Sequence, residues 1–161
     1  MVNTWYTTDG CIGDMIGTTE TTIRHKLGEV RHGVDGTEWV YVQANGAITQ
    51  YDCVGIDESW QAGAITTAMV NDGWKVGVAQ VAFADNEYGW VARRGAGSNL
   101  KVRAAASCAA DVQLFTTATA GVLDDVSGTL NLIRGIVITT GNTSAAAQAC
   151  ILSYPQGAMD S

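Results

Sequence analysis

The segment 76–103 constrains the fold more strongly than any other part of the sequence. Apolar residues recur at every second position in its short runs, with a one-residue slip between Val78 and Val81. Two polar breaks, Asp85–Gly89 and Gly95–Asn99, separate these runs, and both contain residues that accept positive φ angles. Alternation with period two places successive side chains on opposite faces of a β-strand. The segment therefore predicts an antiparallel meander, and it contains no arrangement typical of a catalytic site.

Further segments with strand-like composition flank this meander on both sides. They are residues 38–44, 47–51, 53–57, 111–116, 130–140 and 145–154. Asn45-Gly46 is a strong signal for a two-residue hairpin between the first two of these segments, while Gly135 predicts a bulge or bend. Residues 62–70 fit either a helical turn or a strand, and their β-branched content favours the strand. Short strands at this spacing predict an all-β fold, a compact antiparallel β-barrel or sandwich.

The first 36 residues differ from the rest because they are poor in apolar residues and keep no regular period. We expect residues 1–36 to form an extended N-terminal arm, which becomes ordered by lying on a neighbouring molecule. A few irregular edge strands are the alternative for this part. The regular domain then comprises residues 37–161, which are enough to bury a hydrophobic core.

The charge balance restricts the partners that the protein can bind. The chain carries nine Lys and Arg residues against sixteen Asp and Glu residues, a formal net charge of −7. Binding to nucleic acid depends on basic side chains that neutralise phosphates, so we expect no nucleic-acid partner. Charged residues make up only 16% of the chain, and such a low fraction is typical of a subunit that buries much of its surface.

Neither an export signal nor a membrane-spanning segment is predicted. The first residues lack a basic region followed by an apolar one, and no run approaches the roughly 18 apolar residues of a membrane helix. We therefore expect synthesis in the cytoplasm without export, and no membrane partner.

The four cysteines, Cys11, Cys53, Cys108 and Cys150, form no CxxC pair. A zinc ribbon or a thioredoxin-type site is therefore not indicated. An even count permits two disulfides, but three of the four cysteines lie in apolar, strand-like runs. We expect buried, reduced thiols.

No set of residues predicts catalysis or metal binding. His25, Glu29 and His32 could converge only on a helix, which the neighbouring glycines oppose. Asp124-Asp125 is more typical of a turn than of an acid–base pair, with calcium binding as a minor alternative. A Gly-x-Ser-x-Gly nucleophile motif is absent from the sequence. We therefore expect a non-enzymatic protein without a cofactor or a metal, and a hydrolase with surface carboxylates is the least favoured alternative.

Six segments of the sequence are similar to segments of a known protein family. They are Asp35–Ala44, Gly46–Thr49, Val54–Asp57, Val76–Gly95, Leu114–Thr117 and Gly121–Asp125. In their residues and in their order along the chain, these segments resemble segments of small head decoration proteins of tailed bacteriophages, also called capsid cement proteins. The resemblance covers residues 28–155 and includes no catalytic signature. The long N-terminal arm, with its His and Cys residues, departs from the family pattern.

The resemblance implies a compact β-barrel or β-tulip that commonly assembles as a homotrimer on the outside of an icosahedral head. Its partner would be the phage major capsid protein, whose neighbouring subunits it would clamp against the pressure of the packaged DNA. We expect the protein in the virion, on the outer capsid surface, after synthesis in the host cytoplasm. The expected capsid or subunit contacts are Trp5, Tyr6, Ile23, Leu27 and Trp60.

The alternative function is that of a carbohydrate-binding or fibre-tip β-module on a virion or a cell surface. The five tryptophans motivate it, since aromatic rings could line a sugar-binding face. Three of them lie inside apolar strands, however, which favours packing in the core or at a subunit interface.

Overall fold

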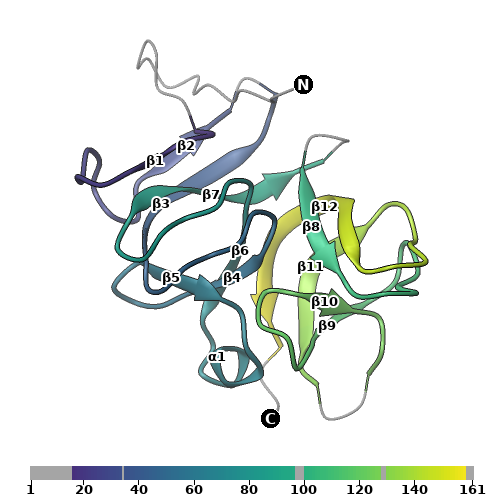
Figure 1. Ribbon diagram of the computed structural model, residues 1–161. Coiled ribbons are helices and arrows are strands. Elements are labelled where there is room, and N and C mark those ends of the chain that lie inside the picture. The colour runs from purple at the N-terminus through teal and green to yellow at the C-terminus, as the bar shows by residue number, and fades with distance from the viewer. Residues whose placement is uncertain (1–15, 34, 97–99, 128–129, 159–161) are drawn as a thin grey trace.

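The chain folds almost entirely into β-strands, as the sequence predicts. The computed structural model describes residues 16–33, 35–96, 100–127 and 130–158. Within these ranges, twelve strands and one short helix are formed (Figure 1). The strands belong to one large mixed sheet, in which six strands close into a ring that is not quite a barrel. The all-β fold class is confirmed.

The six-strand ring, called the ring below, pairs each strand with the next. In order around the ring, the strands are β7 (Tyr88–Gly95), β3 (Glu38–Ala44), β5 (Gln61–Ala64), β4 (Cys53–Ile56), β6 (Lys75–Ala79) and β12 (Ala146–Gly157). The ring closes where β12 meets β7, with Leu152 opposite Gly95. Neighbouring strands are antiparallel except β3 and β5, which are parallel.

The later part of the chain adds strands beside β12 and closes a second circuit. Besides β12, the members of the second circuit are β11 (Leu132–Ile138), β9 (Leu114–Thr116), β10 (Leu123–Asp124) and β8 (Lys101–Ala104). The beginning of β12 pairs with β8, with Ala146 opposite Ala104, and its later residues pair with β11. Strand β12 is therefore shared by the ring and the second circuit, which lie side by side (Figure 1).

Two hydrophobic cores follow from the alternation of side chains along the ring strands. The smaller core contains Val40, Val42, Val54, Ile56 and Val91, which project from one face of the ring. The larger core combines the opposite face of the ring with the second circuit and includes Trp39, Tyr41, Val76, Val78, Ala92, Leu114, Ile136 and Leu152. Because the larger core joins both regions, it lies between them, and the smaller core fills the inside of the ring.

The hairpin predicted at Asn45-Gly46 is wrong. Strand β3 pairs with β7 on one side and with β5 at its end, and residues 47–51 form no strand beside it. Gly46, with a φ of 91°, donates its amide hydrogen to Asp85 Oδ1 at 2.8 Å. The turn is therefore tied to a distant loop, because ring closure already occupies the edges of β3.

Residues 62–70 are a strand in their first part and a helix in their second. Strand β5 is followed by α1 (Thr67–Asn71). Thr66 caps this helix, since its side chain accepts a hydrogen bond from the Met69 amide, and Val70 is buried in the larger core. The preference for a strand is therefore wrong for α1, where a cap and a buried contact outweigh β-branched content.

The predicted meander is confirmed for its first two strands and wrong for its third. Strands β6 and β7 are antiparallel, with Val78 opposite Ala92. Strand β8 leaves this pair and lies against β12 and β10, where Val102 and Ala104 join the larger core. Alternation thus predicts the strands themselves, whereas their pairing depends on residues that are far apart in the sequence.

The bulge predicted at Gly135 is confirmed. Gly135 has a φ of 78°, and the register of β11 against β12 shifts between Arg134 and Ile136. At this point, one residue of β11 lies opposite residues 153–155 of β12. A Cβ atom on Gly135 would lie 2.6 Å from the Ser153 carbonyl oxygen, so only glycine fits without a shift of the backbone.

Two strands begin or end at residues other than those predicted. Strand β9 begins at Leu114 rather than at residue 111, since Asp111 has a φ of 58°, which lies outside the range of regular strands. Strand β12 continues through Pro155, which the sequence places after the end of the strand. A proline is tolerated there because it lies in the bulged part of the strand.

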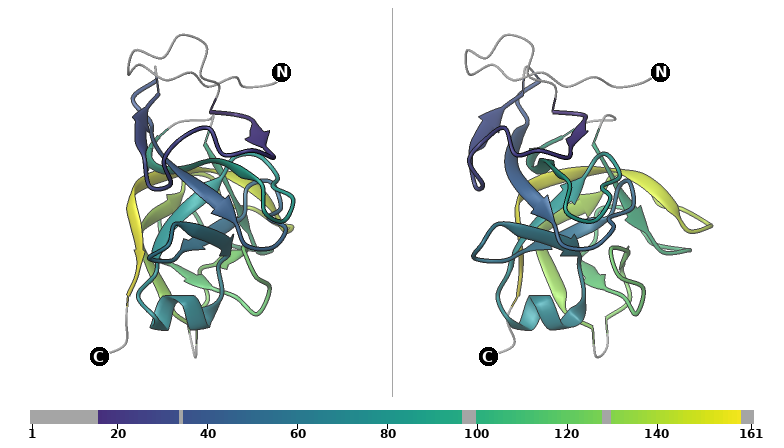
Figure 2. Two further views of the ribbon diagram at one scale, coloured as in Figure 1. Left: turned by 90° about the vertical axis from the view of Figure 1, so that its left-hand side faces the viewer. Right: turned by 60° about the vertical axis from the view of Figure 1, so that its left-hand side comes forward.

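Residues 16–33 lie against the ring at the end of the molecule opposite α1 (Figure 2). Ile16 is buried in the larger core. The short strand β1 (Thr19–Glu20) pairs with β7, and β2 (Val30–His32) pairs with β3. Residues 1–15 lie outside the described residues. The extended arm and its boundary at residue 36 therefore stay a prediction.

Candidate functional site

The five residues expected to contact a capsid or another subunit lie in different environments. Ile23 is 49% exposed, whereas Leu27 is half-buried and packs against the larger core. Trp60 is half-buried as well and packs against the smaller core. The structure brings Leu27 and Trp60 together, since both line a hollow of about 380 Å³. Trp5 and Tyr6 lie outside the described residues.

Contacts within the protein hold the Trp60 ring in place. Trp60 has a φ of 64°, a conformation that is uncommon for a bulky residue. Gly28 lies so close to the ring that a Cβ atom there would be 2.4 Å from Cε2 of Trp60. Lys75 Nζ lies 4.7 Å from the ring centroid, which is a cation–π contact. These contacts explain the position of Trp60 without a sugar, and the carbohydrate-binding alternative stays a prediction.

The two histidines contact different carboxylates. The His25 ring lies 5.1 Å from the Tyr41 ring in an edge-on arrangement, and its Nδ1 is 3.7 Å from a Glu29 oxygen. His32 Nε2 lies 3.5 Å from Glu38 Oε2. The helix that would align the two histidines does not form, because the chain between them turns and enters β2.

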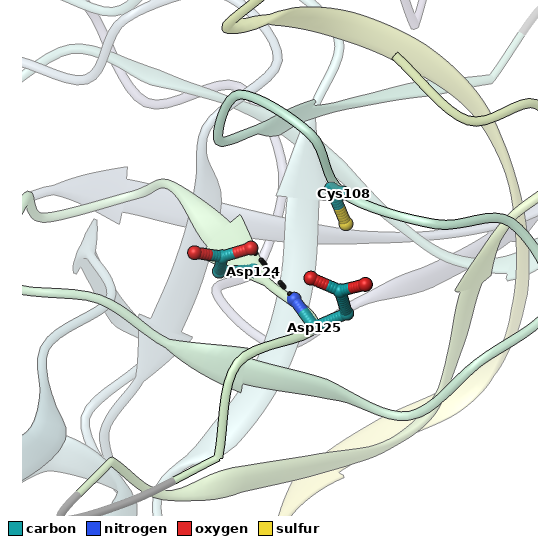
Figure 3. Close-up of side chains that lie close together, drawn as sticks. All are labelled: Cys108, Asp124 and Asp125. Carbon is teal, nitrogen blue, oxygen red and sulfur yellow. Dashed lines mark hydrogen bonds between the residues drawn. The ribbon is translucent and has the colours of Figure 1, made fainter. Parts of the chain in front are cut away.

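Cys108, Asp124 and Asp125 are a group of side chains that could hold a metal ion (Figure 3). One ligand atom of each residue lies within 4.8 Å of the others. The carboxylates already accept backbone hydrogen bonds: the Asp125 amide donates to Asp124 Oδ1 at 2.8 Å, and the Ala109 amide donates to Asp125 Oδ2 at 2.9 Å. These bonds fix two turns and account for the arrangement without an ion.

Burial keeps Cys108 and Asp124 protonated to higher pH. Burial, with smaller contributions from the charges of Asp125 and Asp124, raises the pKa of the Cys108 thiol to about 11. Burial also raises the pKa of Asp124, beside Asp125. A metal ion would have to displace the thiol proton, because the thiolate is the ligand. Sequence reasoning found the Asp124-Asp125 turn and missed Cys108, since no short motif connects them.

Cys53 and Cys150 are free thiols that are buried in the larger core. Burial raises the pKa of Cys150 to about 12 and raises that of Cys53 as well. The prediction of buried, reduced thiols is confirmed for these two residues and for Cys108. Cys11 lies outside the described residues.

An apolar groove of about 420 Å³ runs along β11, on the second circuit. The apolar residues that line this groove are Val112, Leu132, Ile133, Ile136, Val137 and Ile151. Val112 is 37% exposed and Ile151 is 41% exposed, although both side chains are large and apolar. Sequence reasoning missed the groove because alternation along a strand does not show which face stays uncovered.

A smaller cleft of about 230 Å³ lies where the end of β12 runs beside β6 and β7. It is lined by Gly73, Trp74, Lys75, Arg93, Tyr154, Pro155, Gln156 and Gly157. We call it the cationic cleft, because Lys75 and Arg93 are its charged residues. Two aromatic side chains, Trp74 and Tyr154, also contribute to its lining.

A buried carboxylate holds Tyr154 at the cationic cleft. The Tyr154 hydroxyl donates to Glu38 Oε2 at 2.8 Å, and Glu38 is only 8% exposed. This hydrogen bond is the main reason why the pKa of Tyr154 is raised. Because 116 positions separate the two residues in the sequence, no local motif could predict their contact.

The comparisons with known proteins give no match. No protein-family model, no curated protein and no solved structure matches the chain. None of the described helices has the length and apolar character needed to cross a membrane. The function is therefore inferred from the surfaces described above and from the resemblance in sequence.

Proposed function

We propose that the protein is a non-enzymatic structural virion protein, which binds the outer surface of a phage head. It cements neighbouring major capsid subunits against the pressure of the packaged DNA. The observation that carries the proposal is the apolar groove, an uncovered apolar surface on a chain whose sequence resembles head decoration proteins. The all-β fold is compatible with the fold that the resemblance implies.

The apolar groove supports a function in protein–protein contact. Contiguous exposed apolar surface on a soluble protein commonly marks a site where another protein binds. Fully burying a Val or Ile side chain stabilises a complex by roughly 1.5–3 kcal/mol, and Val112 and Ile151 are both partly exposed in the isolated chain. A capsid subunit that covers the groove would gain the part of this stabilisation that corresponds to the surface still exposed.

The charge of the chain supports a position on the outside of the head. A net charge of −7 opposes contact with the packaged DNA, whose phosphates attract basic proteins. The low fraction of charged residues supports extensive contact with other subunits. Self-association as a homotrimer is part of the proposal.

The experiment compares phage heads that carry the protein with heads that lack it. Both are heated while a dye that fluoresces on DNA reports the release of the genome. We expect heads without the protein to release DNA at a lower temperature, and added purified protein to restore the original temperature. Equal release temperatures with and without the protein would overturn the proposal.

A further inference from the structure

We infer that the cationic cleft binds a small sugar that carries a carboxylate. The inference goes beyond the proposed function, because the cleft and the apolar groove are separate hollows. Ser153 lines the groove, while Tyr154, the next residue of β12, lines the cleft. A ligand in the cleft would therefore leave the groove free for a capsid subunit.

The unpaired guanidinium of Arg93 is the first observation that supports binding of a carboxylate in the cleft. Its Nε atom is buried and has no hydrogen-bond partner, and no carboxylate pairs with its guanidinium among the described residues. Its Cζ atom lies 5.8 Å from the centroid of the Tyr154 ring, which is a cation–π contact. A buried donor without a partner destabilises the folded protein. Because Nε itself is closed to solvent, a ligand would meet the guanidinium at its Nη atoms, which are not among the buried unpaired atoms.

Two other arginines, Arg24 and Arg103, have the carboxylate partner that Arg93 lacks among the described residues. Arg103 Nη1 lies 2.6 Å from Asp52 Oδ1, and Arg24 Nε lies 3.3 Å from Glu20 Oε1. The protein has more acidic than basic residues, so carboxylates are not scarce. An arginine that lines a cleft without such a partner is therefore positioned to receive a carboxylate from outside.

Lys75 also lines the cleft and adds a second positive charge to its surroundings. Its ammonium lies against the Trp60 ring and makes no ion pair with any carboxylate in the part of the chain that the structure describes. A hollow lined by one sign of charge concentrates ligands of the opposite sign. The cleft thus attracts anions, although the protein as a whole is negative.

The backbone holds Tyr154 in the position that the cleft requires. Tyr154 has a φ of 50°, in the bulge that faces Gly135. For a bulky residue, this conformation is strained, and it persists only where the surroundings impose it. Bulges turn side chains away from the regular alternation, and Glu38 holds the Tyr154 hydroxyl at the end of that turn. The aromatic ring is therefore fixed before any ligand arrives.

The lining of the cleft defines the class of ligand. A planar guanidinium matches a carboxylate through two parallel hydrogen bonds, which the point charge of a lysine cannot do. The aromatic side chains of Trp74 and Tyr154 suit the apolar faces of a sugar ring. The volume of about 230 Å³ is smaller than that of a drug-sized pocket, which is roughly 300–1,000 Å³. A single acidic sugar, such as a uronic acid, fits these limits.

Titration of the purified full chain with D-glucuronic acid, followed by NMR, tests the inference. We expect saturable shifts with a dissociation constant on the order of 1 mM. D-glucose, the neutral match, and inorganic phosphate should each bind about tenfold more weakly, because neither combines a carboxylate with a sugar ring. The absence of glucuronate binding, or binding of glucose or phosphate as tight as that of glucuronate, would overturn the inference.

Substitutions in the lining of the cleft test whether glucuronate binds there. Arg93→Gln should weaken glucuronate binding about tenfold, since it removes the charge and the planar fork, whereas Arg24→Gln, at an exposed arginine, should not change it. If Arg93→Gln fails to fold, Lys75→Met is the second test, with an expected weakening of about threefold. Its matched control is Lys101→Met, because Lys101 also lies over an aromatic ring, that of Tyr51.

The outcome of these variants separates the inference from the proposed function. Arg93→Gln should bind phage heads as the natural protein does, because Arg93 does not line the apolar groove. Unchanged glucuronate binding in both Arg93→Gln and Lys75→Met would overturn the assignment to the cleft, whatever the result with heads.

Discussion

The apolar side chains of the ring are more deeply buried than some apolar side chains of the second circuit. Inside the ring, Val40, Val42 and Ile56 are 0–1% exposed, and the opposite face of the ring is covered by the larger core. On the second circuit, Val112 and Ile151 are 37% and 41% exposed along the apolar groove. The ring thus buries the apolar residues of both its faces, whereas the second circuit contributes Leu114 and Ile136 to the larger core and leaves the groove uncovered.

A matched pair of isoleucines tests this comparison with the largest expected effect. Ile56→Ala removes a side chain from inside the ring and should lower the free energy of unfolding by about 2–5 kcal/mol, since it leaves a cavity. Ile151→Ala makes the same change in the groove and should cost less than about 1 kcal/mol. Denaturation in urea measures both values. Equal losses would show that the two regions do not differ in this way.

The bulge in β11 should produce the next largest effect. Gly135→Ala should cost about 1–2 kcal/mol for the left-handed backbone alone, and more because its Cβ would meet the Ser153 carbonyl oxygen. Gly46→Ala is the control, since Gly46 also has a positive φ but no atom within 4 Å of its Cβ position. Thermal unfolding measures both, and a control as damaging as Gly135→Ala would contradict the structure of the bulge.

Alkaline pH should weaken the fold through Cys150, which lies in the strand that the ring and the second circuit share. Burial raises its pKa to about 12, from about 8.5 in an unfolded chain. Between these values the unfolded chain loses the thiol proton and the folded protein keeps it, so stability falls as the pH rises. The contribution is fully present below about pH 8.5, and its slope is at most about 1.4 kcal/mol per pH unit.

Replacement of the thiol isolates this contribution. In Cys150→Ala, the free energy of unfolding should fall less steeply than in the natural protein between about pH 9 and 11. Urea denaturation at each pH gives the slope. Identical slopes in the two proteins would show that the folded environment does not hold the proton on Cys150.

The strands were predictable from sequence to the extent that local composition determines them. Residues 38–44 form β3 with the predicted bounds, because β-branched and aromatic residues alternate there without interruption. Gly135 marks its bulge because no other residue fits the backbone. The hairpin after β3 and the pairing of β8 were predicted wrongly, since strand pairing depends on residues distant in the sequence.

The candidate surfaces were less predictable than the strands. The contact between Glu38 and Tyr154 spans 116 positions, and it depends on a bulge that turns Tyr154 toward the cleft. The groove depends on which face of β11 and β12 stays uncovered, which alternation does not encode. Trp60 was expected to contact a capsid or another subunit, yet Gly28 and Lys75 occupy positions beside its ring.

Binding of groove variants to phage heads tests the central claim most directly, although their effect on stability should be the smallest. Purified protein is mixed with heads that lack it, and the bound fraction is measured by sedimentation. Ile151→Lys should fold normally and bind at least about tenfold more weakly, because it places a charge in the apolar contact. Val30→Lys is the control, since Val30 has the same exposure of 41% but lies on β2, and it should bind as the natural protein does. Failure of the natural protein to bind heads, or equal binding by Ile151→Lys, would contradict the account.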